Sequence, residues 1–135
     1  MLPATNKEAI KKGILTALAF KCHIPEFSKF DRKNYFYPDL PLGFQISQFD
    51  EPVSKKGVVE IETEEGEIKK IGITRVHLEN DAGKLTHADG GSLVDFNRAG
   101  SPLMEIVTDP DLRSAKEAKT FAKMVQAILR TIGTS

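Results

Sequence analysis

The sequence lacks the features of a secreted or membrane-inserted protein. It has a single cysteine, Cys22, so no disulfide can form within the chain, and a reducing compartment fits. No apolar run approaches the roughly 20 residues that cross a bilayer. The first residues, Met1-Leu2-Pro3, lead directly into a helix signal and lack the charged-then-apolar pattern of a signal peptide. We therefore expect a cytoplasmic protein with no membrane partner.

The sequence also lacks an excess of basic residues. Lys and Arg total 19, and Asp and Glu total 19. A free-standing nucleic-acid-binding module usually carries a basic excess to neutralise phosphates, so any RNA contact must be local or shared with other subunits. The glycine patterns of Walker loops and Rossmann turns are absent as well, so a bound nucleotide would be held in another way.

The order of predicted elements is helix, antiparallel strands, helix, which is typical of an α+β fold. Asn6 is a predicted N-cap for a helix over residues 7–22, and Ser114 with Glu117 forms a predicted capping box for a helix that ends before Gly133. Between them, the residue patterns predict short strands and a loop over 27–50, a hairpin over 57–78, and strands at 92–96 and 103–107.

Residues 71–84 contain the largest concentration of chemically reactive side chains. In an extended strand, alternate side chains share a face, which would align Arg75, His77, Glu79 and Asp81. A histidine and two carboxylates at this spacing could hold Mg²⁺ or a similar cation, with Arg75 near phosphate oxygens. The same alternation is also that of a solvated strand face, and spacing alone leaves both interpretations open.

Two further segments carry candidate binding residues. Residues 31–39 place basic side chains beside aromatic ones, a mixture that suits either RNA contacts or the packing of a proline-bounded loop. In residues 93–98, Asp95 and Arg98 are candidates for pocket contacts or for a structural pair.

Several of these segments resemble motifs of one family, the B subunits of the aspartyl/glutamyl-tRNA(Asn/Gln) amidotransferases. The likeness covers nearly the whole chain and is carried by residues 29–39, 45–50, 71–84, 92–100 and 102–107. It implies an α+β catalytic cradle, similar to glutamine synthetase and guanido kinases, that uses ATP and Mg²⁺. It also implies a misacylated tRNA substrate and partner A and C subunits of the amidotransferase. The implied reaction activates the carboxylate of Glu-tRNA(Gln) or Asp-tRNA(Asn) with ATP and replaces it with an amide.

The resemblance also implies roles for individual residues. His77, Glu79 and Asp81 match the catalytic, metal-binding acidic strand, and Asn80 replaces an acid usual in the family. The segment that lines the substrate pocket and the ammonia route is matched by Lys33, Tyr35 and Tyr37. Secondary candidates for contact with substrate or phosphate are Arg75, Asp95 and Arg98.

Residues 1–135 are expected to form a single partial domain. The resemblance places an N-terminal strand with a Glu-x-His pair, and helical tail domains, outside this sequence. We therefore expect the isolated chain to be inactive. The alternative is a non-catalytic fragment that binds tRNA or the other amidotransferase subunits.

Overall fold

The structure is a computed structural model that describes residues 4–135. Its elements follow the order helix, strands, helix, which confirms the predicted α+β class with antiparallel sheets. They are α1 (Lys7–Ala19), β1 (Asp31–Asn34), β2 (Phe44–Ser47), β3 (Ser54–Glu62), β4 (Ile68–Asn80), β5 (Lys84–Ala88), β6 (Gly91–Asp95), β7 (Pro102–Thr108) and α2 (Ala115–Thr131). The likeness to a glutamine-synthetase cradle stays a prediction.

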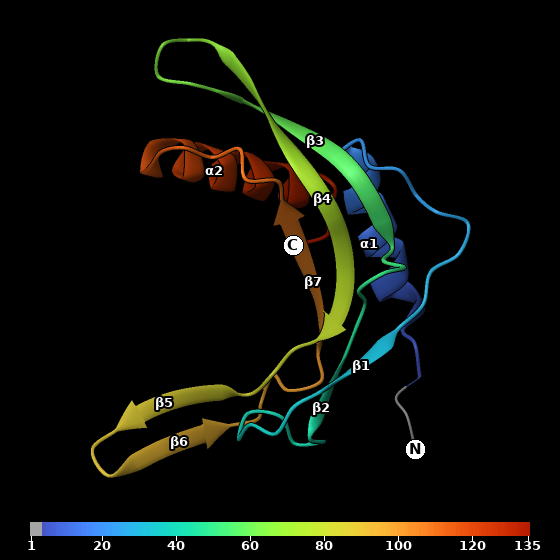
Figure 1. Cartoon of the computed structure of the whole chain (residues 1–135), viewed down its shortest axis with the longest axis vertical. Coiled ribbons are helices and arrows are strands. Elements are labelled where there is room, and N and C mark those ends of the chain that lie inside the picture. The colour runs from blue at the N-terminus through green and yellow to red at the C-terminus, as the bar shows by residue number, and fades with distance from the viewer. Residues whose placement is uncertain (1–3) are drawn as a thin grey trace.

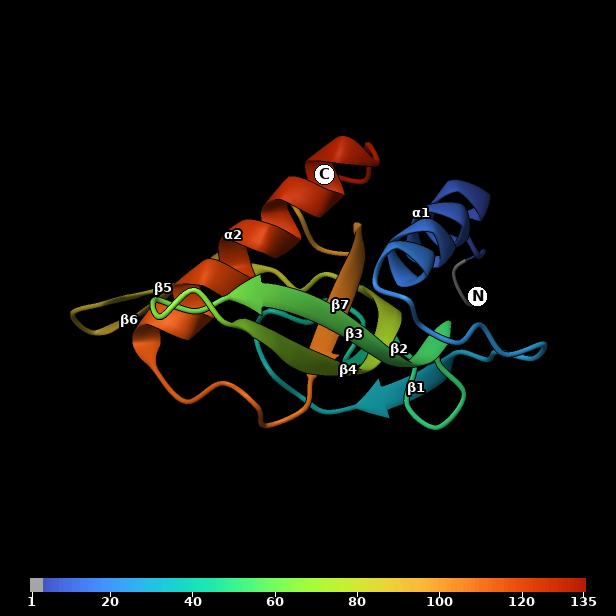
Figure 2. The same cartoon turned by 90° about the horizontal axis from the view of Figure 1, so that it is seen from above.

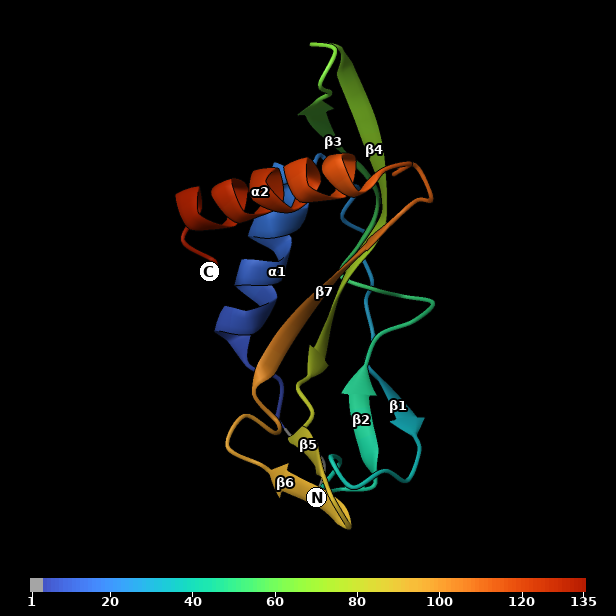
Figure 3. The same cartoon turned by 90° about the vertical axis from the view of Figure 1, so that its left-hand side faces the viewer.

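Strand β4 organises the molecule. It is the central strand of the β3–β4–β7 sheet, while β1 pairs with β2 and β5 pairs with β6. The turn of the β3–β4 hairpin and the turn of the β5–β6 hairpin lie at opposite ends of the molecule (Figure 1). Both helices cover one face of the three-stranded sheet (Figure 2), and the β1–β2 pair lies on the other side of β4 (Figure 3).

The core lies between the two helices and the three-stranded sheet. Phe20 and Val76 are completely buried there, and Phe121 and Val125 from α2 pack against the same cluster. Burial of such side chains is the main favourable contribution to folding. Cys22 belongs to this cluster, as expected for a small packed side chain, and burial raises the pKa of its thiol. No helix within residues 4–135 is long and apolar enough to cross a bilayer.

The helix caps follow the sequence closely. The Asn6 side chain accepts hydrogen bonds from the amides of residues 8 and 9, which confirms it as an N-cap. Helix α1 ends at Ala19 and not at residue 22, because Lys21 has a φ of +56° and turns the chain out of the helix. Gly133, with a φ of +70°, follows the end of α2 as predicted.

The predicted capping box at the start of α2 is only half formed. Ser114 Oγ accepts from the Glu117 amide at 3.1 Å, as predicted. The Glu117 carboxylate accepts from the amide of Arg113 and from Lys69 Nζ, at 2.7 Å and 2.8 Å. Glu117 therefore joins the helix start to the β3–β4 hairpin.

A β-bulge divides β4 into two parts. Ile71 and Ile73 are buried, but the pairing register with β7 shifts between Ile73 and Arg75, and the next buried apolar side chains are Val76 and Leu78. An extra residue in a strand reverses which face the following side chains occupy. Arg75, His77 and Glu79 therefore leave the helix-covered face of the sheet and point toward the β1–β2 side.

The loop after β7 holds the chain at the bulge. Asp111 accepts a hydrogen bond from the Gly72 amide at 2.8 Å, and Asp109 accepts one from Thr74 Oγ1 at 2.5 Å. A Cβ atom at Gly72 would overlap with the Asp109 carboxylate, so only glycine leaves room for this loop.

Candidate functional site

A histidine and two carboxylates meet on the face of the sheet opposite the helices. His77 Nε2 lies 3.5 Å from Glu79 Oε2 and 3.6 Å from Glu105 Oε2. Glu105 comes from β7, where it is paired directly with His77 across the two strands. One donor atom from each residue lies within 4.8 Å of the others, a spacing that could hold a metal ion.

Arg75 determines how the His77 ring is oriented. Its Nε–H donates to His77 Nδ1 at 3.2 Å, so Nδ1 is an acceptor in this arrangement. A neutral imidazole then carries its proton on Nε2, which faces the two carboxylates. In this state the Nε2 proton points toward the carboxylates and is donated to Glu79, and His77 could bind a metal through Nε2 only after this proton had moved.

Glu79 is stabilised as a carboxylate by its neighbours. The hydrogen bond with His77 lowers the pKa of Glu79 below its ordinary value of 4.5, and this outweighs the opposing effect of partial burial. Ser47 Oγ donates to Glu79 Oε2 at 3.1 Å, and the positive charge of Lys33 acts in the same direction. Strand β2 therefore places the Ser47 hydroxyl beside the Glu79 carboxylate, and β1 supplies the positive charge of Lys33.

These side chains line a groove of about 710 Å³ between β4, β7 and the β1–β2 pair. His77 is 3% exposed at its base, whereas the Glu105 side chain is 51% exposed at its rim. The remaining lining includes several cations and acids: Lys29, Asp31, Arg32, Lys33, Asp50 and Arg75. The site is therefore an open, strongly polar groove with a buried histidine beneath it.

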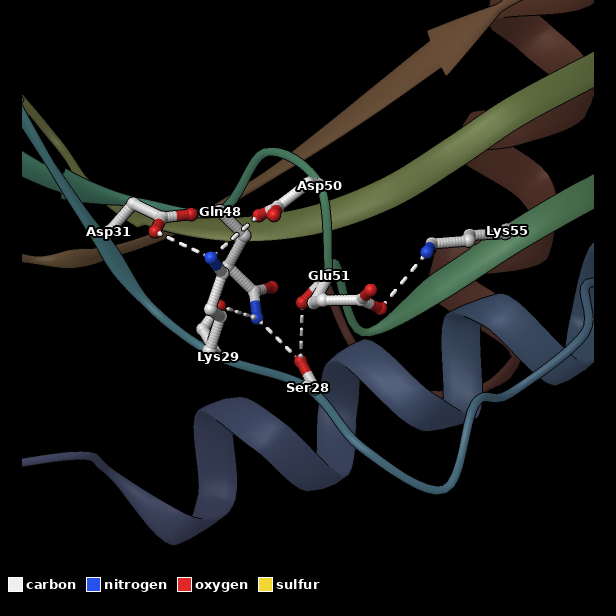
Figure 4. A network of polar contacts seen from close by, with 7 residues as sticks. All are labelled: Ser28, Lys29, Asp31, Gln48, Asp50, Glu51 and Lys55. Atoms are coloured by element: carbon white, nitrogen blue, oxygen red, sulfur yellow. Dashed lines mark hydrogen bonds and ion pairs between the residues drawn. The ribbon is translucent and has the colours of Figure 1, made fainter.

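Gln48 holds the groove wall against β4. Strand β3 begins opposite Val76, so the Leu78 amide lies beyond the end of that pairing, and Gln48 Oε1 accepts from it at 3.0 Å. Gln48 Nε2 donates to Ser28 Oγ at 2.7 Å and to the Lys29 carbonyl at 3.1 Å (Figure 4). One side-chain amide therefore connects β4 with two loops.

Comparison with known proteins identifies the family. A model of the GatB/GatE catalytic domain matches residues 1–135. The chain belongs to the GatB/GatE catalytic-domain family. Relatives named as the B subunit of aspartyl/glutamyl-tRNA(Asn/Gln) amidotransferase include one from Brevibacillus brevis, 55% identical over 96% of the chain and 27% of the relative. Those from Bacillus pumilus and Geobacillus kaustophilus are each 54% identical over 100% of the chain and 28% of the relative.

This GatB/GatE chain therefore spans just over a quarter of the length of the relatives it matches. The match confirms the family that residues 29–39, 45–50, 71–84, 92–100 and 102–107 indicated. The catalytic roles assigned to single residues are not decided by it, and they depend on the geometry.

The prediction that Asp81 shares a face with His77 and Glu79 is wrong. Strand β4 ends at Asn80, and the Asp81 amide donates to the Ser101 carbonyl in a turn. The Asp81 carboxylate lies 3.6 Å from Arg98 Nε, which makes this a structural pair at the end of the strand. Its proposed place in the cluster is occupied by Glu105, which the local spacing of the sequence does not single out.

The other candidates near the second hairpin lie apart from the groove. Asp95 accepts from the Asn97 amide at 2.9 Å and so stabilises its own turn. Arg98 Nε also donates to the Ala82 carbonyl at 3.1 Å. Of the two alternatives open for Asp95 and Arg98, the structure favours structural roles, although Arg98 pairs with Asp81 and not with Asp95.

The aromatic candidates divide into two groups. Burial raises the pKa of Tyr35, with further contributions from the negative charges of Asp39 and Glu79. Lys33 Nζ lies 5.5 Å from the Tyr35 ring centroid and also lines the groove. Tyr37 is 52% exposed, and among the described residues it is not part of the groove lining. The role of Tyr37 in the ammonia route stays a prediction.

Asn80 stands where the family resemblance expects an acid. Its backbone carbonyl accepts from Gln45 Nε2 at 2.8 Å. Asn80 lines a second depression that shares Glu79, Asp31 and Arg32 with the groove of His77. The effect of this replacement on metal binding stays a prediction.

Proposed function

We propose that this chain forms part of the ATP- and Mg²⁺-dependent catalytic site in the B subunit of a glutamine-dependent aspartyl/glutamyl-tRNA amidotransferase. The names of the relatives and the family match support the assignment to that polypeptide. The observation that carries the catalytic part is the meeting of His77, Glu79 and Glu105 in a polar groove. In this proposal the enzyme activates Glu-tRNA(Gln) or Asp-tRNA(Asn) and amidates it.

The donor set of the groove fits a magnesium ion. Mg²⁺ is commonly held by one or two carboxylates, retains several water molecules and takes phosphate oxygens as further ligands. Glu79 and Glu105 offer two carboxylates, and the Ser47 and His77 contacts orient the first of them. When bound, the ion would neutralise charge on the phosphate oxygens of ATP.

The cations of the groove suit a negatively charged substrate. Arg75 and Lys33 line it beside the acids, and Lys29 lies between Asp31 and Asp50, at 3.5 Å and 3.1 Å. A guanidinium binds phosphate or carboxylate oxygens through directed hydrogen bonds. Arg75 would orient the transferred phosphate, while its Nε–H keeps His77 in the state that donates to Glu79.

The partners follow from the same proposal. The A and C subunits and a misacylated tRNA would complete the enzyme, and the cytoplasm is where those components would meet. Because the chain covers 27–28% of its relatives, we expect residues outside it to complete the pocket and the isolated chain to be inactive.

The proposal predicts that Glu105→Gln weakens divalent-cation binding about tenfold or more, because it removes one of two carboxylate ligands. Titration of the full-length B subunit with Mn²⁺, followed by electron paramagnetic resonance, measures this directly. Glu67→Gln at the exposed hairpin turn is the matched control and should leave Mn²⁺ affinity unchanged. Equal Mn²⁺ affinity in Glu105→Gln and the unchanged subunit would refute the metal site.

A second measurement separates catalysis from simple binding. In the assembled enzyme, Glu105→Gln should lower the rate of ATP-dependent Gln-tRNA or Asn-tRNA formation and leave tRNA affinity nearly unchanged. A variant that retains full activity would favour the non-catalytic alternative, in which the chain only binds tRNA or the other subunits.

A further inference from the structure

An exposed aromatic ring stands at the edge of the groove on a firmly held loop. Phe49, between β2 and β3, is 74% exposed. Binding residues are disproportionately found on loops that a rigid scaffold holds in position. The loop residues on both sides of Phe49 are anchored by the polar network drawn in Figure 4.

The anchoring is continuous along the loop. Gln48 Oε1 accepts from the Val53 amide at 3.2 Å, which closes the loop on itself. Asp50 pairs with Lys29 Nζ at 3.1 Å, and the Glu51 carbonyl accepts from Ser28 Oγ at 3.0 Å. A ligand that contacts Phe49 would therefore meet a ring whose backbone is already ordered, which lowers the entropy lost on binding.

Phe49 also connects two depressions of the surface. Together with Arg75 it lines the acidic groove of His77 and a second groove of about 580 Å³ that contains Lys55 and Lys56. The Arg75 guanidinium carbon lies 5.9 Å from the Phe49 ring centroid, and Arg75 Nε contacts His77. An aromatic ring, a guanidinium and the acidic cluster thus follow one another across the surface.

We propose that Phe49 is the base-stacking platform of an adenosine-nucleotide site whose phosphates extend past Arg75 into the groove of His77, Glu79 and Glu105. A nucleotide offers a flat base for an aromatic face and phosphates for a guanidinium, which is the order of groups here. The phosphate end of this assignment rests on the proposed function. The adenosine can come from ATP or from the 3′-terminal nucleotide of a tRNA, and the experiment separates these sources.

The chain contains no tryptophan, so the substitution Phe49→Trp creates a single fluorescent reporter at the platform. ATP, inorganic tripolyphosphate and a short RNA hairpin ending in CCA would each be titrated against this variant. Phe36→Trp is the matched control, because Phe36 is 94% exposed and is part of neither groove lining among the described residues. Phe49→Ala and Phe49→Leu, followed by calorimetry, test the ring itself.

We expect ATP or the CCA-ended RNA to quench the fluorescence of Phe49→Trp and to leave that of Phe36→Trp unaffected, with tripolyphosphate giving no quenching. Quenching by ATP alone assigns the site to free nucleotide, and quenching by the RNA alone assigns it to the tRNA end. Phe49→Ala should weaken binding of that ligand about tenfold, and Phe49→Leu nearly as much, because leucine restores bulk without a stacking face.

Two results would overturn the platform. One is the absence of quenching in Phe49→Trp by both adenosine ligands, and the other is equal quenching by tripolyphosphate, which has no base. Mn²⁺ titration of Phe49→Ala in the full-length B subunit keeps this inference separate from the proposed function, since its Mn²⁺ affinity should equal that of the unchanged subunit. Absence of the expected quenching with Mn²⁺ binding intact contradicts only this inference, whereas absence of Mn²⁺ binding in the unchanged full-length subunit contradicts the proposed function.

Discussion

The two parts of β4 on either side of the bulge belong to one continuous strand but bury different kinds of side chain. Before it, Ile71 and Ile73 face the helices, and the strand contributes to the core. After it, Val76 and Leu78 continue that core while His77 and Glu79, on the other face, are also largely enclosed. The first part is amphipathic, whereas the second is covered on both faces.

The difference follows from a single extra residue. With strict alternation, Arg75, His77 and Glu79 would share the face of Ile71 and Ile73 and would point into the apolar core. The register shift after Ile73 sends them to the β1–β2 side, where Ser47 and Lys33 meet Glu79. The candidate site therefore depends on the bulge as much as on the residues that form it.

Reversing the polarity of a core residue after the bulge should have the largest effect. The bulge places Val76 on the helix-covered face, where it is completely buried. Val76→Asp puts an unpaired charge there, and burying unpaired charges is among the most destabilising changes, so we expect a loss of more than about 4 kcal/mol and no cooperative unfolding transition in urea. Thr74→Ala loses only the Asp109 hydrogen bond, which should cost about 1 kcal/mol. Similar stability of the two variants would contradict this role of the bulge, because without it Val76 would face the polar groove.

Truncation in the first part of the strand should have an intermediate effect. Ile71 is completely buried, and Ile71→Ala should reduce the free energy of unfolding by about 2–5 kcal/mol. Ile68, on the same strand, is 65% exposed, so Ile68→Ala should change it by about 0.5 kcal/mol or less. Urea denaturation of the two variants measures the free energy of unfolding lost when the same residue type is truncated at a buried and at an exposed position. Equal losses would mean that α2 does not cover this part of the sheet as described.

Neutralising Glu79, in the part of β4 after the bulge, should have the smallest effect on stability, and that effect should depend on pH. The pKa of Glu79 is lower in the folded chain than its ordinary value of 4.5, so ionised Glu79 stabilises the folded state above about pH 4.5. This contribution is lost as the pH falls through the lowered pKa. The stability difference between the unchanged chain and Glu79→Gln should therefore be present at about pH 6–7 and shrink toward about pH 3. A difference that grows on acidification would show that the pKa is raised.

Much of the fold could be predicted because the deciding patterns are local. The caps at Asn6 and Ser114 are read from a few neighbouring residues, and so is the turn of the β3–β4 hairpin. The change of phase between Ile73 and Val76 is visible in the sequence as well. Strand β5 was missed because its hairpin with β6 is mostly exposed and leaves no clear apolar alternation.

The site was harder to predict because it joins distant segments. Glu105 belongs to it through its pairing with His77 on a different strand, and this register cannot be deduced from local spacing. Asp81 fits the alternation but lies just beyond the last residue of β4, where the chain turns. Periodicity therefore located the strand and the correct face for His77 and Glu79, and it failed where the strand ended and where a second strand contributed.

The side chain of Gln48 has a consequence for how the molecule opens. Gln48 Oε1 accepts hydrogen bonds from the backbone amides of Val53 and Leu78, and Gln48 Nε2 donates to the segment at Ser28 and Lys29. None of these three segments can therefore detach without breaking a hydrogen bond to the Gln48 side chain. Solvent exchange of the Val53 and Leu78 amide protons should therefore occur in one concerted local unfolding event, at nearly equal rates. The loop that carries Phe49 would then melt together with the end of β4 and not as an independent flap.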